Sequence, residues 1–291
     1  MRVSVYLPFA MSLVLAAGGP ILSRWLAPRT AARVLTAGAA VTTASALWAL
    51  GLLVLSLLVE RGQPVLSADV PRLLGLLAIV LAVAVLVRVA LVARAHSAAL
   101  RFAREFARAH PAGDGGLVVL ADGLPFAATL PGPEGRIVIS SAMLASLGPR
   151  ERRVLLCHER SHLRHRHDRY QLAGELASAG NPLLGAVRRS ITHALERWAD
   201  EDAAAAIGSR PLVARTLVSA ALAPPPATAG ALGFSADGVA ARVHALYGSP
   251  THTRLSAVAL VLAVAGLAAL ASADATVAIE RLLHLVTIGS V

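Results

Sequence analysis

The sequence has little charge, few aromatic side chains, one cysteine and no lysine. Charged residues make up 15% and aromatic residues 4% of the 291 positions, whereas 56% are hydrophobic and the mean hydropathy is +0.66. Soluble domains are normally less apolar and more charged, so this composition favours a membrane protein. The single cysteine, Cys157, excludes a disulfide within the chain, and its apolar flank favours a core position over a nucleophile beside His158.

Because lysine is absent, all 27 basic residues are arginine, and the net charge is +10. Nucleic-acid binding usually relies on a stripe of basic and aromatic residues, which the chain lacks, so we expect no direct binding of nucleic acid. The arginines cluster beside apolar segments, as they do when they orient a protein in a bilayer.

Four apolar stretches are long enough to cross a bilayer, which takes about 20 helical residues. They cover about residues 3–22, 34–59, 73–92 and 255–273. A cleaved signal peptide is not expected, because three arginines (Arg24, Arg29 and Arg33) follow the first apolar run instead of preceding it. Arg88 interrupts the third stretch near its end, from where its side chain is expected to snorkel to the interface.

The basic flanks predict the topology. Arginines follow the first and third spans, which places residues 94–254 in the cytoplasm. We therefore expect three transmembrane helices in residues 1–93, a cytoplasmic domain in 94–254, and a fourth transmembrane helix with a short extracytoplasmic tail in 255–291. The predicted location is the cell membrane, which the chain crosses several times.

The cytoplasmic segment is predicted to be a small α+β domain inserted into an α-helical membrane protein. Apolar runs near residues 117–120, 126–130 and 136–139 indicate three strands. Gly148–Glu151 is typical of a helix start, and further helices are expected at about 169–177, 184–207 and 239–247, with Gly208 ending the second of these. The strand near 126–130 is either a structural hairpin or an open edge that binds substrate in extended form.

The helix that follows Gly148 carries the sequence His158-Glu159-Arg160-Ser161-His162. Residues four apart share a helix face, so His158 and His162 can bind one metal ion. Glu159 is then placed to take a proton from a water molecule at that ion. The ligand types suit zinc, although other divalent ions fit similar sites.

A second helix downstream carries Glu196-Arg197-Trp198-Ala199-Asp200. Glu196 can supply the third metal ligand, and Asp200 can orient a ligating histidine. The alternative is a solvated acidic helix face. His193, one turn before Glu196, is a candidate stabiliser of the oxyanion or an ordinary surface histidine. The basic run Arg164–Arg169 is expected to be a solvated turn that faces lipid headgroups, with an extra metal ligand or substrate contacts as the alternative.

An HExxH helix followed by a helix with Glu-x-x-Ala-Asp resembles the gluzincin peptidases of families M48 and M56. A zinc domain between a third and a fourth span is most similar to M56, a family that contains the membrane proteins that sense β-lactams and inactivate a repressor. The resemblance implies zinc bound by His158, His162 and Glu196. It also implies that Glu159 is the base and that Asp200 orients one of the ligating histidines. The penicillin-binding domain of the β-lactam sensors has no counterpart here, so direct antibiotic sensing is not expected.

The favoured reading is thus a membrane-embedded zinc endopeptidase that cleaves a protein substrate, with a DNA-binding repressor as one candidate. Three alternatives remain. One is a non-catalytic membrane regulator with a structural zinc, for which Glu159 would be unnecessary. Another is a transporter or channel component, whose spans should carry more ionisable residues than Arg88 alone. The third is a membrane-protein quality-control protease of the M48 type. The sequence gives no indication of oligomeric state.

Overall fold

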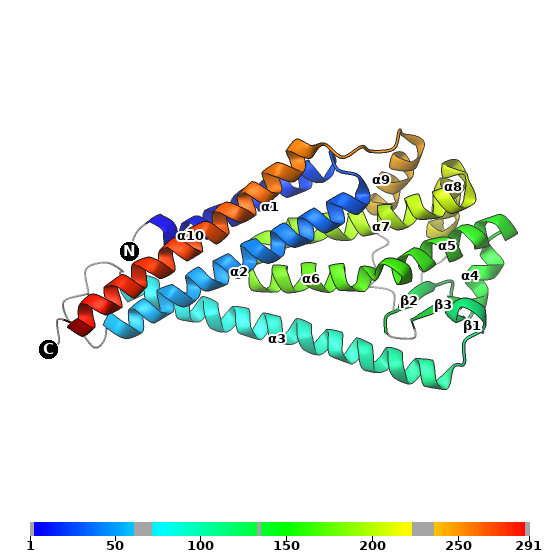
Figure 1. Ribbon diagram of the computed structural model, residues 1–291. Helices are drawn as coiled ribbons and strands as arrows, with labels where there is room; N and C mark the ends of the chain where they lie inside the picture. Colours follow the sequence, from blue (N-terminus) through cyan, green and yellow to red (C-terminus); the bar gives the residue numbers. More distant parts are fainter. Residues whose placement is uncertain (1–2, 61–71, 133–134, 223–235, 289–291) are drawn as a thin grey trace.

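The computed structural model describes residues 3–60, 72–132, 135–222 and 236–288 (Figure 1). Long helices run along most of the molecule, and a small sheet lies at one end. The long helices, called the frame below, are α1 (Leu7–Ser23), α2 (Pro28–Glu60), α3 (Arg72–Ala109) and α10 (Leu255–Ile288). The remaining elements are β1 (Leu117–Leu120), β2 (Ala127–Leu130), β3 (Arg136–Ser140), α4 (Ser141–Ser146), α5 (Pro149–His165), α6 (His167–Gly180), α7 (Gly185–Ile207), α8 (Arg210–Leu222) and α9 (Ala236–Tyr247).

Within the described residues, three helices are long and apolar enough to cross a membrane: segments Pro28–Leu55, Leu76–Ala109 and Leu255–Ala278. They correspond to the second, third and fourth predicted spans. Hardly any of the apolar stretch of α3 is buried, as expected for a helix whose side chains contact lipid. The composition and these helices together indicate a membrane protein.

The frame differs from the prediction at three points. The first predicted span is a helix of 17 residues, α1, which is shorter than the other three. The third predicted span ends near residue 92, whereas α3 continues unbroken to Ala109, because the arginines that follow end the apolar run without ending the helix. At the C-terminal end, the predicted tail continues α10 as far as Ile288.

The sheet has the order β1-β3-β2, with β1 parallel and β2 antiparallel to β3. The three strands lie where the apolar runs predicted them. The central strand β3 is the most buried, because Ile137 and Ile139 pack against Met143 and Leu147 at the start of the helical part. This packing leaves β2 at the edge of the sheet, in contact with α5.

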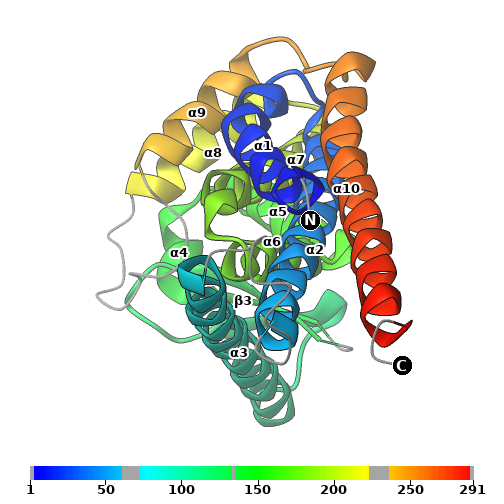
Figure 2. The ribbon, with the colours of Figure 1, turned by 90° about the vertical axis from the view of Figure 1, so that its left-hand side faces the viewer.

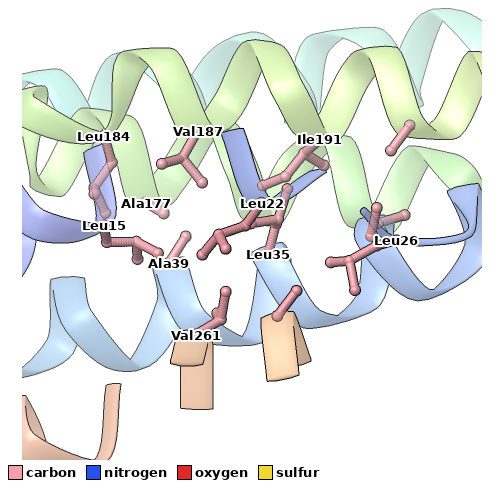
Figure 3. Packing of buried hydrophobic residues seen from close by; sticks show 14 of the residues in the cluster. Leu15, Leu22, Leu26, Leu35, Ala39, Ala177, Leu184, Val187, Ile191 and Val261 are labelled. Carbon is pink, nitrogen blue, oxygen red and sulfur yellow. The ribbon is translucent and has the colours of Figure 1, made fainter. Parts of the chain in front are cut away.

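Helices α6 and α7 form a hairpin that enters the frame of long helices. Helix α6 packs against α2 and α3, and α7 packs against α1 and α2 (Figures 1 and 2). The largest apolar cluster joins them, and its members come from α1, α2, α6, α7, α10 and the short turn before α7 (Figure 3). Labelled members include Leu15, Leu35, Ala39, Val187 and Val261. The predicted domain and the predicted membrane helices therefore share one core.

Polar contacts fix the tip of the hairpin beside the middle of α2. The Asn181 amide donates to the Ser12 hydroxyl at 2.7 Å, and the Thr43 hydroxyl donates to the Ala177 carbonyl at 3.2 Å. The Arg88 guanidinium donates to the Ser178 carbonyl at 3.2 Å, and its predicted reach to the interface stays a prediction. A cation near the C-terminal carbonyls of α6 is stabilised by the helix dipole.

Close contact at Gly180 gives a test of the hairpin packing. An added Cβ would lie 2.8 Å from the Thr43 Cγ2 atom, so Gly180→Ala should lower the free energy of unfolding by about 1–3 kcal/mol, the usual cost of overpacking. Thermal unfolding in detergent measures the change. Gly51→Ala is the matched control, because no atom lies within 4 Å of the added Cβ. Adding Thr43→Ser removes the opposing methyl group and should restore stability; an unaffected Gly180→Ala variant would contradict this packing.

Candidate metal centre

The HExxH sequence lies in the middle of α5, whose start matches the sequence signal. Pro149 occupies the first turn, and the Glu151 carboxylate accepts a hydrogen bond from the Gly148 backbone amide at 2.9 Å. His158 and Glu159 are each 8% exposed, so this face of the helix is buried. The α5 helix thus presents both residues to the inside of the protein.

Glu196 on α7 faces the two histidines. The Nε2 atoms of His158 and His162 are 3.1 Å apart, and each lies 3.6 Å from an oxygen of Glu196. Zinc ligands at about 2.0–2.1 Å in tetrahedral geometry are about 3.3 Å from one another. The three side chains therefore have the types and the spacing that fit one zinc ion, as the sequence predicted.

Asp200 lies behind His158, with its Oδ1 atom 3.0 Å from the Nδ1 atom. This contact leaves the Nε2 atom of His158 free to face a metal. Asp200 is 1% exposed and is paired with Arg242 of α9, whose Nε and terminal nitrogen donate to its two oxygens at 2.8 and 2.7 Å. Another nitrogen of Arg242 lies 2.9 Å from Glu196. Sequence reasoning missed Arg242, because no motif or spacing connects α9 to α7.

The buried charges change the protonation of this cluster. Burial lowers the pKa of His158, but the hydrogen bonds and charges of Asp200 and Glu196 outweigh it and raise that pKa to about 10. Burial alone would raise the pKa of Glu196 and of Asp200, yet the hydrogen bond with His158 and the charge of Arg242 lower that of Glu196, and hydrogen bonds with Arg242 and His158 lower that of Asp200. Both carboxylates are therefore ionised, and they create a field that favours a cation between the histidines.

His167 contacts the second ligating histidine. Arg166 adopts the left-handed conformation (φ +51°), which turns the chain between α5 and α6. The turn places the His167 Nδ1 atom 2.9 Å from the His162 Nδ1 atom. Burial and the neighbouring histidines lower the pKa of His167 to about 3, so it is neutral. The prediction of a solvated turn was wrong for His167, which is only 2% exposed.

Two carboxylates that follow Asp200 hold helices together. Asp202 accepts from the Ser161 hydroxyl at 2.7 Å and from Arg164 at 2.9 Å, and its Oδ2 atom is 2.8 Å from His165 Nε2. These contacts join α7 to α5 beside the metal ligands. Glu201 pairs with Arg210 at 2.7 Å. The acidic stretch is therefore not a solvated face, which was the alternative left open by the sequence.

Glu159 lines an open cleft next to the three ligands. Its Oε2 atom accepts a hydrogen bond from the Thr129 hydroxyl of β2 at 2.5 Å. The cleft has a volume of about 1320 Å³ and is bordered by β2, α5, α6, α7 and the end of α3. His96 and Arg104 of α3 contribute to its wall, so a helix that continues a predicted span borders the site.

Two other residues singled out in the sequence are His193 and Cys157. His193 is on α7 but is not among the residues that line the cleft, and its role as an oxyanion stabiliser stays a prediction. Burial, with Arg197 and Arg242 nearby, lowers the pKa of His193. Cys157 is half-buried: it packs against the apolar cluster of α7, α8 and α9, as expected, and it also borders the cleft.

Comparison with known proteins agrees with this geometry. The family model described as Peptidase family M48 matches residues 93–224. No curated protein and no solved structure matches the chain. The match supports a metallopeptidase of the M48 type, a class that is typically zinc-dependent, whereas the resemblance to M56 is not confirmed. The matched segment contains the HExxH sequence, Glu196 and Asp200 but ends before Arg242.

Arg242→Gln should weaken zinc binding by about 10–100-fold, the usual cost of losing a group that orients metal ligands. The substitution leaves Asp200 without its bidentate partner and removes a contact from Glu196. Chelator competition on the purified protein measures the affinity. Arg242→Lys keeps the charge without the paired donors of a guanidinium, so its zinc affinity should lie between those of the wild type and Arg242→Gln. The control is Arg210→Gln, because Arg210 links α8 to α7 and to the end of α9 away from the metal ligands. Equal zinc affinities in all variants would refute the role of Arg242.

Proposed function

We propose that this protein is a membrane-embedded, zinc-dependent endopeptidase, with His158, His162 and Glu196 as the zinc ligands. The observation that carries the proposal is the position of Glu159, which lines a cleft immediately beside three correctly spaced ligands. The match to an M48 peptidase model supports the same reading.

A zinc ion in this site would supply a Lewis acid that polarises a carbonyl group and lowers the pKa of a water molecule. Glu159 would take the proton from that water and deliver it to the leaving amine. The Thr129 hydroxyl fixes one carboxylate oxygen of Glu159. Within the described part of the chain nothing donates to the other oxygen, which would therefore be available for the water.

Substrate would bind in extended form along β2. Ala127, Ala128 and Thr129 line the cleft, and β2 is at the edge of the sheet. An extended peptide can add to such an edge through backbone hydrogen bonds, which select little sequence by themselves. Because Thr129 also contacts Glu159, a peptide on this edge would lie close to the base.

The cleft would open at the surface of the membrane on the cytoplasmic side. The charge-free part of α2 begins directly after Arg33, and Arg33 stacks on Trp198, two residues from Glu196. The metal centre would therefore lie near the level where α2 enters the apolar layer, because Arg33 and Glu196 are connected through Trp198. Chain segments close to a membrane anchor would reach it most readily. A DNA-binding repressor as substrate stays a prediction from the sequence.

The alternatives predict different features. A structural zinc in a non-catalytic regulator needs no carboxylate beside the ligands, whereas Glu159 is held in place by Thr129 and faces a cleft. A transporter would use ionisable residues within its spans, whereas Arg88 is bonded to the tip of the hairpin. A quality-control protease of the M48 type is compatible with the family match and with a cleft at the membrane surface.

Glu159→Gln should lower peptide-bond cleavage by about 10²–10⁴-fold, the contribution expected of a general base, while the three ligands stay intact. The fragments in cells that carry the wild-type chain or the variant are compared by sequencing of new protein termini. Glu105→Gln, which alters an exposed carboxylate on α3, is the matched control. Fragments made only with Glu159 present would establish proteolysis. Identical fragments from both metal-loaded proteins would favour the non-catalytic regulator.

A further inference from the structure

Two arginines of α2 converge on one tryptophan of the helix that carries Glu196. The guanidinium carbons of Arg29 and Arg33 lie 5.4 and 5.5 Å from the centre of the Trp198 ring. Both arginines are exposed. Within the described part of the chain, neither forms a hydrogen bond or an ion pair, so no carboxylate there neutralises the two charges. Two like charges on one ring repel, and an anion beside them would relieve that repulsion.

The position of the pair selects the anion. Arg33 is the last charged residue before the charge-free stretch of α2, so both guanidiniums lie where this helix would leave the apolar layer. The position of the α6–α7 hairpin agrees with this placement of the two arginines. Its tip lies beside Thr43, about 20 Å further along α2 than Arg29 and thus within the charge-free stretch. At the edge of the apolar layer, the abundant anions are the phosphate groups of lipids.

We propose that Arg29 and Arg33, braced by Trp198, bind the phosphate group of an anionic phospholipid. Guanidinium groups suit a phosphate because their donors match its oxygens in pairs. The ring holds both side chains in place, which reduces the entropy lost on binding. The inference rests on the membrane location in the proposed function and is independent of catalysis.

The site would connect the lipid to the metal ligands. The Trp198 ring centre is 4.6 Å from that of His165 and 4.8 Å from that of His167. His167 in turn contacts His162 through its Nδ1 atom. Binding at the two arginines would therefore stabilise the packing around Trp198 and, through His167, the orientation of His162. Anionic lipid bound at the two arginines is therefore also expected to raise the affinity of the protein for zinc.

The test uses Trp198 as its own reporter. The chain has three tryptophans, so Trp25→Phe with Trp48→Phe leaves Trp198 alone. Adding Glu159→Gln makes the measurement independent of peptidase activity. The full chain in uncharged detergent is titrated with short-chain phosphatidylglycerol, with phosphatidylcholine of the same chain length, and with inorganic phosphate. Arg29→Gln/Arg33→Gln is compared with Arg150→Gln/Arg153→Gln, which removes two exposed arginines on α5.

We expect a saturable change in Trp198 emission at about tenfold lower concentration of phosphatidylglycerol than of phosphatidylcholine. The change should be lost in Arg29→Gln/Arg33→Gln, weakened in each single variant and kept in Arg150→Gln/Arg153→Gln. Equal responses to the two lipids, no response, or full binding by Arg29→Gln/Arg33→Gln would overturn the proposal. Saturation by inorganic phosphate at the same concentration as by phosphatidylglycerol would assign the site to free phosphate and overturn the proposal of a lipid ligand. Should the double variant not fold, unchanged binding in both single variants would count against the site.

Discussion

The metal centre depends on the pairing of one buried carboxylate, Asp200, with partners from two other helices. A carboxylate that is 1% exposed is stable only when charges and hydrogen bonds compensate for the lost water. His158 of α5 and Arg242 of α9 provide that compensation, and Arg242 extends it to Glu196. Requirements of charge therefore fix the relative position of α5, α7 and α9. The ligands converge as a result of that arrangement.

The helices that carry the site are also part of the frame of long helices. Apolar packing between α7, α1 and α2 fixes Glu196 relative to the predicted spans, and the tip contacts of Asn181 and Arg88 fix the other end of the hairpin. A change in the packing of the frame would then shift α7 and, with it, the metal ligand Glu196. If the long helices cross a bilayer as predicted, the packing around the site should respond to the lipid environment, because the same helices form part of its core.

The sequence predicted the features that depend on local patterns. The HExxH spacing, the Glu196 and Asp200 pair, the three strands and the end of α7 at Gly208 follow from helix and strand periodicity and turn chemistry. Long-range partners could not be predicted in this way: Arg242 and Thr129 reach the site only through the folded chain, and His167 does so through the left-handed turn at Arg166. The packing of the α6–α7 hairpin against the long helices could not be predicted either, because charged residues such as Glu175, Arg188 and Arg189 interrupt its apolar pattern. Apolar length alone did not distinguish the shorter α1 from a full span.

The central claim is that three side chains from two helices hold one zinc ion, and the zinc content of the purified protein tests it most directly. Elemental analysis should find about one zinc per wild-type chain and little in His162→Ala or Glu196→Ala. His165→Ala, which alters a neighbouring histidine outside the ligand set, should keep its zinc. Full zinc content in folded His162→Ala and Glu196→Ala, or no zinc in the wild-type chain after loading, would contradict the account.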